Sequence, residues 1–145
     1  PRASDRLRGT VLHGILSRVI VPSDLHDAVW DACRCGDIDS SQAEYYERWL
    51  SGAIRSEAPG EWFPEDGKGV SNEVTLISAD GELFRPDRVV EKDGKVIVID
   101  YKTKDKESRY IRQVRRYMDL YRDMGRRDVR GYLWYLASGE IQQIK

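Results

Sequence analysis

The feature that most limits how this chain can fold is the apolar run Val96-Ile97-Val98-Ile99, which ends in Asp100-Tyr101-Lys102. β-Branched residues favour extended backbone, and successive side chains of a strand point to opposite faces of a sheet. Both faces of this strand are apolar, so both need a covering layer, as in the central strand of a layered α/β domain. We therefore expect a sheet with helices packed against it.

The remaining sequence supplies the other elements of such a domain. Apolar residues at three- and four-residue spacing predict helices, and short apolar runs bounded by Gly, Asp and Pro predict strands. Asp80-Gly81 and Asp93-Gly94 are typical of tight turns between antiparallel strands. The order predicts one α/β domain over residues 1–145, with a mixed sheet flanked by helices. We expect helices over 6–20, from Ser23 or Asp24 to about Cys35, from Ser40 or Ser41 to about Ser56 and over 107–124, and strands over 61–63, 70–78, 83–91, 96–100, 129–137 and 141–144.

Size and composition are those of a globular protein. The 145 residues suffice for one buried core, and 40% hydrophobic with 34% charged residues argues against disorder. No apolar run approaches the roughly 20 residues that span a bilayer, so no membrane partner is expected. The N-terminus lacks a secretory leader, which favours a cytoplasmic location. Because the sequence begins at Pro1 rather than Met, we expect a fragment of a longer polypeptide.

The net charge of −1 conceals an uneven distribution of charge along the chain. From Lys102 to Arg127 there are ten Lys or Arg and four Asp or Glu, a net charge of +6, while the remainder carries −7. A basic segment beside an acidic remainder is what a polyanion-binding site built around metal-binding carboxylates needs. A solvated, charge-rich helix would give the same pattern, so charge alone does not decide between them.

The cysteine content excludes one class of metal centre. Cys33 and Cys35 are the only cysteines. Two thiols cannot form a four-thiolate zinc or iron–sulfur site within this chain. Their spacing is also poor for a disulfide, so two reduced thiols are expected.

Asp87, Asp100 and Lys102 form the strongest chemical pattern in the sequence. Asp100 and Lys102 share one face of the central strand. If a turn at Asp93-Gly94 joins this strand to the preceding one, Asp87 lies opposite about Asp100, where two carboxylates should repel. A divalent cation such as Mg²⁺ or Mn²⁺, which prefers oxygen ligands, would remove that repulsion. An ion pair of Asp100 with Lys102, without any metal, is the alternative.

Pro86-Asp87 followed by Asp100-Tyr101-Lys102 resembles the signature of the PD-(D/E)xK nucleases. The resemblance extends to four ordered motifs of RecB-type exonuclease domains. These domains lie at the C-terminal ends of helicase–nucleases such as the RecBCD and AddAB complexes. It spans residues 9 to about 136 and implies an α/β fold with a restriction-endonuclease-like core and extra N-terminal helices. The four segments are Gly9-Thr10-Val11-Leu12-His13, Arg85-Pro86-Asp87-Arg88-Val89, Val98-Ile99-Asp100-Tyr101-Lys102-Thr103 and Gln113-Val114-Arg115-Arg116-Tyr117.

The resemblance implies further ligands for the metal. His13 would supply a neutral imidazole nitrogen, and Tyr101 would supply its backbone carbonyl. Glu73 matches an acidic position, where it would complete the metal shell or hold a water. From the residues alone, a core histidine at position 13 and a surface glutamate at position 73 remain open.

The resemblance also implies a DNA-binding face. Gln113 and Tyr117 are four residues apart and share one side of a helix. Their amide and phenol would contact a DNA strand, although a core Tyr117 and a surface Gln113 are equally compatible with the spacing. The candidates for contact with phosphates are Arg85, Arg88, Thr103, Lys104, Arg109, Arg112, Arg115 and Arg116.

These observations predict a deoxyribonuclease that depends on Mg²⁺ or Mn²⁺ and hydrolyses phosphodiesters with a metal-activated water. Asp87, Asp100, Lys102 and Glu73 would be its catalytic residues, with Lys102 orienting or deprotonating the water. The resemblance implies exonuclease action in DNA end processing, with a helicase motor in the same polypeptide or complex. The alternative is a nuclease-fold domain that binds DNA, or packs against a helicase, without cleavage. A stand-alone nuclease of the kind that carries a four-cysteine cluster is disfavoured.

Overall fold

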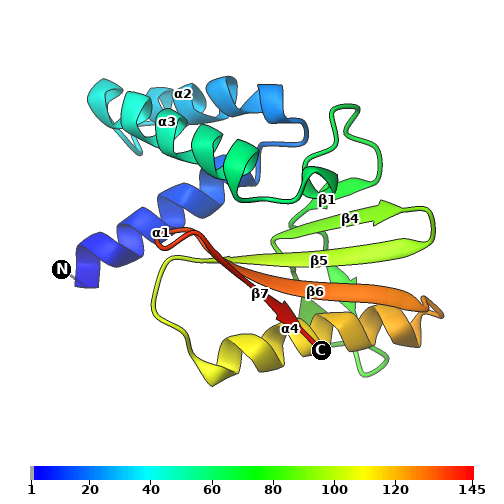
Figure 1. Ribbon diagram of the computed structural model, residues 1–145. Coiled ribbons are helices and arrows are strands. Elements are labelled where there is room, and N and C mark those ends of the chain that lie inside the picture. The colour runs from blue at the N-terminus through cyan, green and yellow to red at the C-terminus, as the bar shows by residue number, and fades with distance from the viewer. Residues whose placement is uncertain (1) are drawn as a thin grey trace. The chain divides into compact units, whose positions relative to one another are not determined.

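The computed structural model describes residues 2–145, with side chains from Leu7 onward. The chain divides into two compact units, Pro1–Gly67 and Lys68–Lys145, which we describe separately. One domain over residues 1–145 therefore stays a prediction. In the described part of the chain, no helix has the length and apolar character needed to cross a membrane. The elements are α1 (Arg2–Leu16), η1 (Pro22–Asp24), α2 (Leu25–Arg34), α3 (Ser40–Ser56), η2 (Gly60–Trp62), β1 (Val70–Asn72), β2 (Leu76–Ile77), β3 (Leu83–Phe84), β4 (Arg88–Lys92), β5 (Lys95–Lys102), α4 (Ser108–Asp123), β6 (Asp128–Tyr135) and β7 (Glu140–Ile144) (Figure 1).

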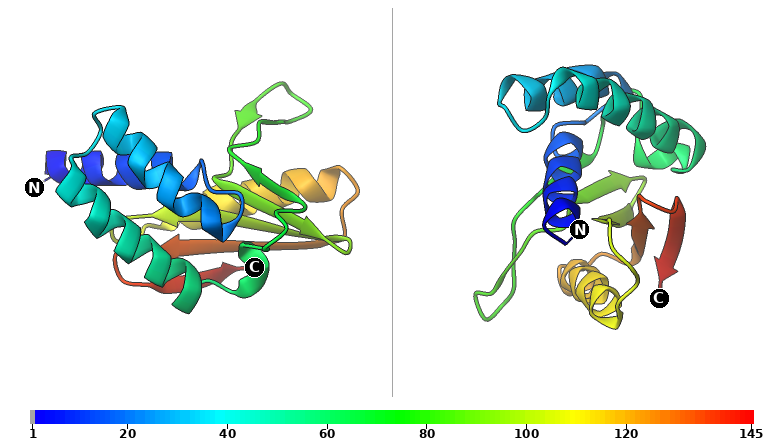
Figure 2. Two further views of the ribbon diagram at one scale, coloured as in Figure 1. Left: turned by 90° about the horizontal axis from the view of Figure 1, so that it is seen from above. Right: turned by 90° about the vertical axis from the view of Figure 1, so that its left-hand side faces the viewer.

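The N-terminal unit is helical. Its second and third helices, α2 and α3, run along each other, as the left view of Figure 2 shows. A capping box begins α3: the Asp39 side chain accepts from Gln42 N, and the Gln42 side chain accepts from Asp39 N, both at 2.9 Å. The strand predicted over 61–63 is wrong, because Gly60–Trp62 forms a 3₁₀ turn that buries Trp62. Both cysteines are free, as expected.

The C-terminal unit is built on a five-stranded mixed sheet in the order β1-β4-β5-β6-β7. The central strand β5 pairs antiparallel with β4 and parallel with β6. Every side chain from Val96 to Tyr101 is buried, as the apolar run predicted. The α/β fold with a mixed central sheet and a restriction-endonuclease-like core is therefore confirmed.

Two predicted strands are each broken in the middle. The segment 70–78 divides into β1 and β2 at Glu73, whose φ of 54° lies in the left-handed region that strands do not use. The segment 83–91 divides into β3 and β4 around Pro86, which has no N–H to donate to a neighbouring strand. As a result β2 and β3 form a separate two-stranded hairpin. The turn at Asp93-Gly94 is as predicted, with both residues at positive φ.

The helix α4 lies along one face of the sheet (Figures 1 and 2). Its apolar side chains Val114, Tyr117 and Met118 belong to one core cluster with Val98 of β5 and Leu133 of β6. Its arginines at positions 109, 112, 115 and 122 are exposed, as the sequence predicted, whereas Arg116 is half-buried. The side chains of β5 that face α4 are those in phase with Val98, and Asp100 and Lys102 continue this phase to the end of the strand.

Gly131 of β6 allows α4 to approach the sheet. A Cβ built there would lie 2.4 Å from Met118 Sδ and 2.6 Å from Val114 Cγ1. We expect Gly131→Ala to lower the free energy of unfolding by about 1–3 kcal/mol, because α4 must move away from the sheet. Urea denaturation measures this. The control is Gly52→Ala on α3, where a Cβ meets nothing within 4 Å and should not lower stability. Equal stability of Gly131→Ala and the wild type would show that this contact is not tight.

Candidate active site

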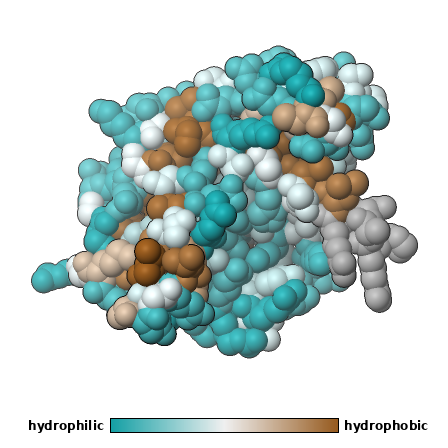
Figure 3. Space-filling model, turned by 180° about the vertical axis from the view of Figure 1, so that it is seen from behind, coloured by the Kyte–Doolittle hydropathy of each residue, from teal (hydrophilic) through white to brown (hydrophobic). Residues whose placement is uncertain are grey.

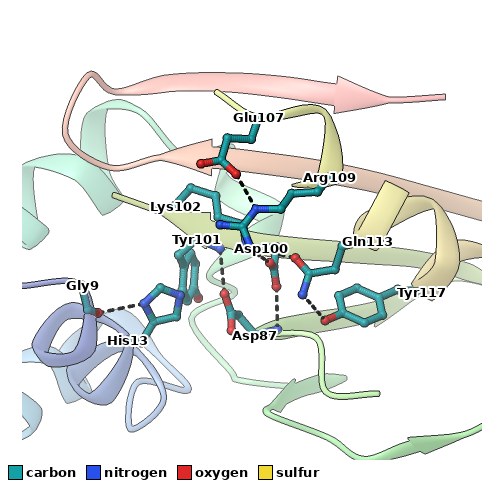
Figure 4. Close-up of polar contacts among 10 residues, drawn as sticks. All are labelled: Gly9, His13, Asp87, Asp100, Tyr101, Lys102, Glu107, Arg109, Gln113 and Tyr117. Atoms are coloured by element: carbon teal, nitrogen blue, oxygen red, sulfur yellow. Dashed lines mark hydrogen bonds and ion pairs between the residues drawn. The ribbon is translucent and has the colours of Figure 1, made fainter. Parts of the chain in front are cut away.

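The pairing of β4 with β5 places two aspartates side by side. The register joins Arg88 to Ile99, so Asp87, the residue before β4, lies next to Asp100, as the sequence predicted. The Asp87 backbone N–H donates to Asp100 Oδ1 at 3.3 Å, and the Tyr101 backbone N–H donates to Asp87 Oδ2 at 2.8 Å (Figure 4). The Asp100 carboxylate is thus held by the backbone of Asp87, and the Asp87 carboxylate by the backbone next to Asp100.

The surroundings of Asp100 disfavour the negatively charged form of its side chain. The residue is 3% exposed. The pKa of Asp100 is raised to about 7, by burial first and by the neighbouring Asp87 carboxylate second, while Lys102 opposes the rise. A buried carboxylate beside a second carboxylate is stabilised by added positive charge, which a proton or a cation can supply.

The Lys102 ammonium is held by groups from β5 and α4. Its Nζ lies 3.0 Å from Asp100 Oδ2 and donates to Gln113 Oε1 at 3.0 Å. Gln113 Nε2 in turn donates to the Tyr117 hydroxyl at 3.0 Å, as Figure 4 shows. The same Nζ lies 4.4 Å from the centroid of the Tyr110 ring, within the range of a cation–π contact. An oxygen-rich pair and an oriented ammonium therefore lie together at one end of the sheet.

A model of the PD-(D/E)XK nuclease superfamily matches residues 1–144. The chain belongs to this superfamily. Membership indicates that the chain is a nuclease, an enzyme that acts on nucleic acid. Nucleases of this superfamily generally use divalent metals such as Mg²⁺. No curated protein matches the sequence.

The aspartate pair of this nuclease suits a divalent metal. Carboxylate oxygens are the ligands that Mg²⁺ prefers, and a divalent cation would offset the repulsion between two adjoining carboxylates. Among residues 7–145, no three His, Cys, Asp or Glu side chains gather into a group that could hold a metal ion. The pair alone is a partial ligand set, which suits Mg²⁺, because this ion usually binds through one or two carboxylates and keeps several waters.

The remaining predicted ligands lie in different parts of the nuclease. Glu73 lies between β1 and β2, where its backbone N–H donates to Asp87 O at 3.0 Å and its carboxylate is 4.0 Å from Arg85. The Tyr101 side chain is 1% exposed and lies on the sheet face opposite Asp100. His13 belongs to the N-terminal unit, and its Nδ1 donates to Gly9 O at 2.8 Å.

Two of the predicted DNA contacts are buried. Arg88 is 0% exposed, and its Nη1 donates to Asn72 Oδ1 at 3.2 Å. Tyr117 is 4% exposed and packs its ring edge-to-face on Phe84. A buried guanidinium or phenol does not face a phosphate, so the proposed DNA-binding surface does not include Arg88 or Tyr117. Arg85, Lys104, Arg109, Arg112, Gln113 and Arg115 are exposed, whereas Thr103 and Arg116 are half-buried.

The structure adds one residue to the site that no sequence motif singles out. Tyr110, on the first turn of α4, is 6% exposed and places its ring against Lys102. Its helical phase with Val114 and Tyr117 predicts burial correctly but says nothing of the lysine. Only the packing of α4 across the end of β5 brings the two together, so no local sequence signal could have found this contact.

Proposed function

We propose that this chain is the RecB-type exonuclease domain of a helicase–nuclease, a Mg²⁺- or Mn²⁺-dependent deoxyribonuclease that processes DNA ends in recombinational repair. Membership of the nuclease superfamily and the adjoining Asp87, Asp100 and Lys102 side chains support cleavage. The RecB type, the helicase motor in the same polypeptide or complex and the cytoplasmic location rest on the resemblance of the four ordered motifs. The single observation that carries the proposal is the aspartate pair with its lysine.

In the proposed reaction the chain positions a phosphodiester and a water. Asp87 and Asp100 would hold the metal, with His13, Glu73 and the Tyr101 carbonyl as further ligands. A bound Mg²⁺ supplies a Lewis acid that lowers the pKa of a water and offsets negative charge on the phosphate. Lys102 would orient or deprotonate the attacking water and offset charge on the transition state. Gln113 and Tyr110 hold its side-chain nitrogen in place.

The exposed arginines of α4 would bind the DNA backbone. Arg112 and Arg115 are three residues apart and share one exposed side of the helix. Their charge would favour any DNA sequence equally, because contacts with phosphates carry no base information. Binding of this kind weakens steeply as salt concentration rises.

The proposal is tested by incubating the purified chain with Mg²⁺ and end-labelled linear DNA beside the same DNA as a covalently closed circle. We expect the linear DNA to be degraded from its ends, the circle to survive, and EDTA to stop the reaction. Degradation of the circle would contradict exonuclease action. Failure to cleave either DNA, with intact binding, would support a non-cleaving domain instead.

Gln113 offers a test of how Lys102 is held. We expect Gln113→Leu to lower kcat roughly ten- to hundredfold, because the ammonium loses a hydrogen-bond acceptor and its fixed position. KM should change little. Steady-state cleavage measures both constants. A rise in KM at constant kcat would instead identify Gln113 as a DNA contact. Gln143→Leu, at an exposed glutamine of β7, is the matched control and should change neither constant.

A further inference from the structure

The β2–β3 hairpin presents two large apolar side chains to solvent. Ile77 and Leu83 face each other in the antiparallel register and are 62% and 64% exposed. Directly paired residues point to the same side of a two-stranded sheet, so the two side chains form one apolar surface. Figure 3 shows the side of the molecule that carries this hairpin, with apolar residues grouped among polar ones.

The other side of the hairpin is anchored to α4. Leu76, paired with Phe84, is 6% exposed and belongs to the core cluster around α4. The Phe84 ring packs edge-to-face on Tyr117 at 6.3 Å, and the Arg116 guanidinium lies 5.1 Å from the Phe84 ring centroid. The hairpin is thus fixed on one side, and Ile77 and Leu83 remain exposed on a supported element.

The hairpin is tied closely to the aspartate pair. Leu83 and Asp87 are four positions apart, so at most about 14 Å of extended chain separates them. The residues that lead into β2 are tied to the same place, because Glu73 N donates to Asp87 O at 3.0 Å. The apolar surface is therefore within reach of a base that belongs to a nucleotide near the cleaved phosphate.

The charges around the hairpin suit a nucleic-acid strand. Arg85 is exposed between the hairpin and Asp87, and Arg116 lies on Phe84 at the base of the hairpin. The acidic residues Asp80 and Glu82 lie at the far tip, where the Asp80 carboxylate accepts from the Ser78 hydroxyl. Phosphates are therefore attracted toward the base of the hairpin and repelled from its tip.

We propose that Ile77 and Leu83 form a packing surface for an unstacked base of the DNA strand that is being cleaved. Aliphatic side chains pack on base faces in other nucleic-acid-binding proteins, where they act as wedges against unstacked bases. Arg85 and Arg116 bind the phosphates on either side of that base. This inference rests on the proposed nuclease function and adds a contact that selects strands with at least one unpaired nucleotide at the site.

The test uses the double variant Ile77→Ser/Leu83→Ser and a set of single-stranded oligonucleotides. Each oligonucleotide carries one abasic nucleotide, placed at successive positions from the end. We expect the wild type to bind one or two of these abasic strands roughly five- to tenfold more weakly than the intact strand, the loss expected from one apolar contact. The double variant should bind intact and abasic strands equally, with the weaker affinity. Fluorescence anisotropy with Ca²⁺ in place of Mg²⁺ measures these dissociation constants.

The control is Met124→Ser, which removes another large exposed apolar side chain, 53% exposed, just beyond α4. It should bind every strand as the wild type does. Should the double variant melt at a lower temperature, the single variant Ile77→Ser repeats the test with a smaller change. Equal dissociation constants for the wild type and the variants overturn the inference, as does a wild-type dimer that the double variant abolishes without a change in DNA affinity. Because binding is measured without cleavage, absence of cleavage would refute the proposed activity and leave this test intact.

Discussion

Replacing Asp100 by asparagine is expected to lower the single-turnover rate of DNA cleavage by at least about 10³-fold. Asparagine keeps the size of the side chain and its oxygen acceptor but removes the charge that would hold a divalent cation and the Lys102 ammonium. The measurement is cleavage of end-labelled linear DNA at saturating Mg²⁺ and excess protein, so that the rate reports chemistry rather than binding.

The matched control is Asp105→Asn, at an exposed aspartate three residues beyond β5. It should cleave within twofold of the wild type, since surface charge changes of this kind have small effects. An Asp100→Asn protein with more than a tenth of the wild-type rate would remove Asp100 from the catalytic machinery.

Asp100→Asn is expected to be more stable than the wild type in the absence of metal at pH 8, by about 2–4 kcal/mol. Asp100 is buried, and its pKa is raised to about 7 from 3.8 by burial first and by Asp87 second. Between these two values the folded protein holds a proton that the unfolded chain has released. The free energy of unfolding of the wild type therefore falls as pH rises through this window, and the full loss is present above pH 7.

Asparagine does not titrate, so the variant escapes this loss. The difference in free energy of unfolding between Asp100→Asn and the wild type should be small near pH 4 and should grow to a plateau above pH 7. Urea denaturation in EDTA across this range measures the difference. The difference between Asp105→Asn and the wild type should stay flat. A plateau of opposite sign, with Asp100→Asn less stable at pH 8, would show that the Lys102 ion pair outweighs the cost of burial.

Most of the sheet could be predicted from the sequence because its signals are local. The apolar run ending in Asp100 marks the central strand, and Asp93-Gly94 sets the register that brings Asp87 opposite it. The sequence does not predict the breaks in the segments 70–78 and 83–91, because the strand-like pattern of residues continues through Glu73 and Pro86. At these two residues the backbone leaves the sheet. Residues 61–63 predict a strand because aromatic residues favour strands, although Gly60–Trp62 forms a turn.

The side-chain partners at the site could be predicted only in part. That Asp100 and Lys102 share a face follows from the two-residue period of a strand, and their 3.0 Å contact confirms it. The burial of Arg88 could not be foreseen, because its burial depends on packing beyond its own strand, and a basic residue beside Asp87 suggests phosphate binding equally well. Likewise, the bond from Lys102 to Gln113 depends on the position of α4 against β5.

In the proposed active site, Asp87 and Asp100 together hold one divalent cation. Anomalous diffraction from crystals soaked in Mn²⁺ would locate that ion. We predict a Mn²⁺ peak within about 2.0–2.3 Å of a carboxylate oxygen from each aspartate, and no such peak in crystals of Asp87→Asn. A wild-type crystal that binds Mn²⁺ elsewhere, or that keeps Lys102 as the only cation beside Asp100 at saturating Mn²⁺, would contradict the account.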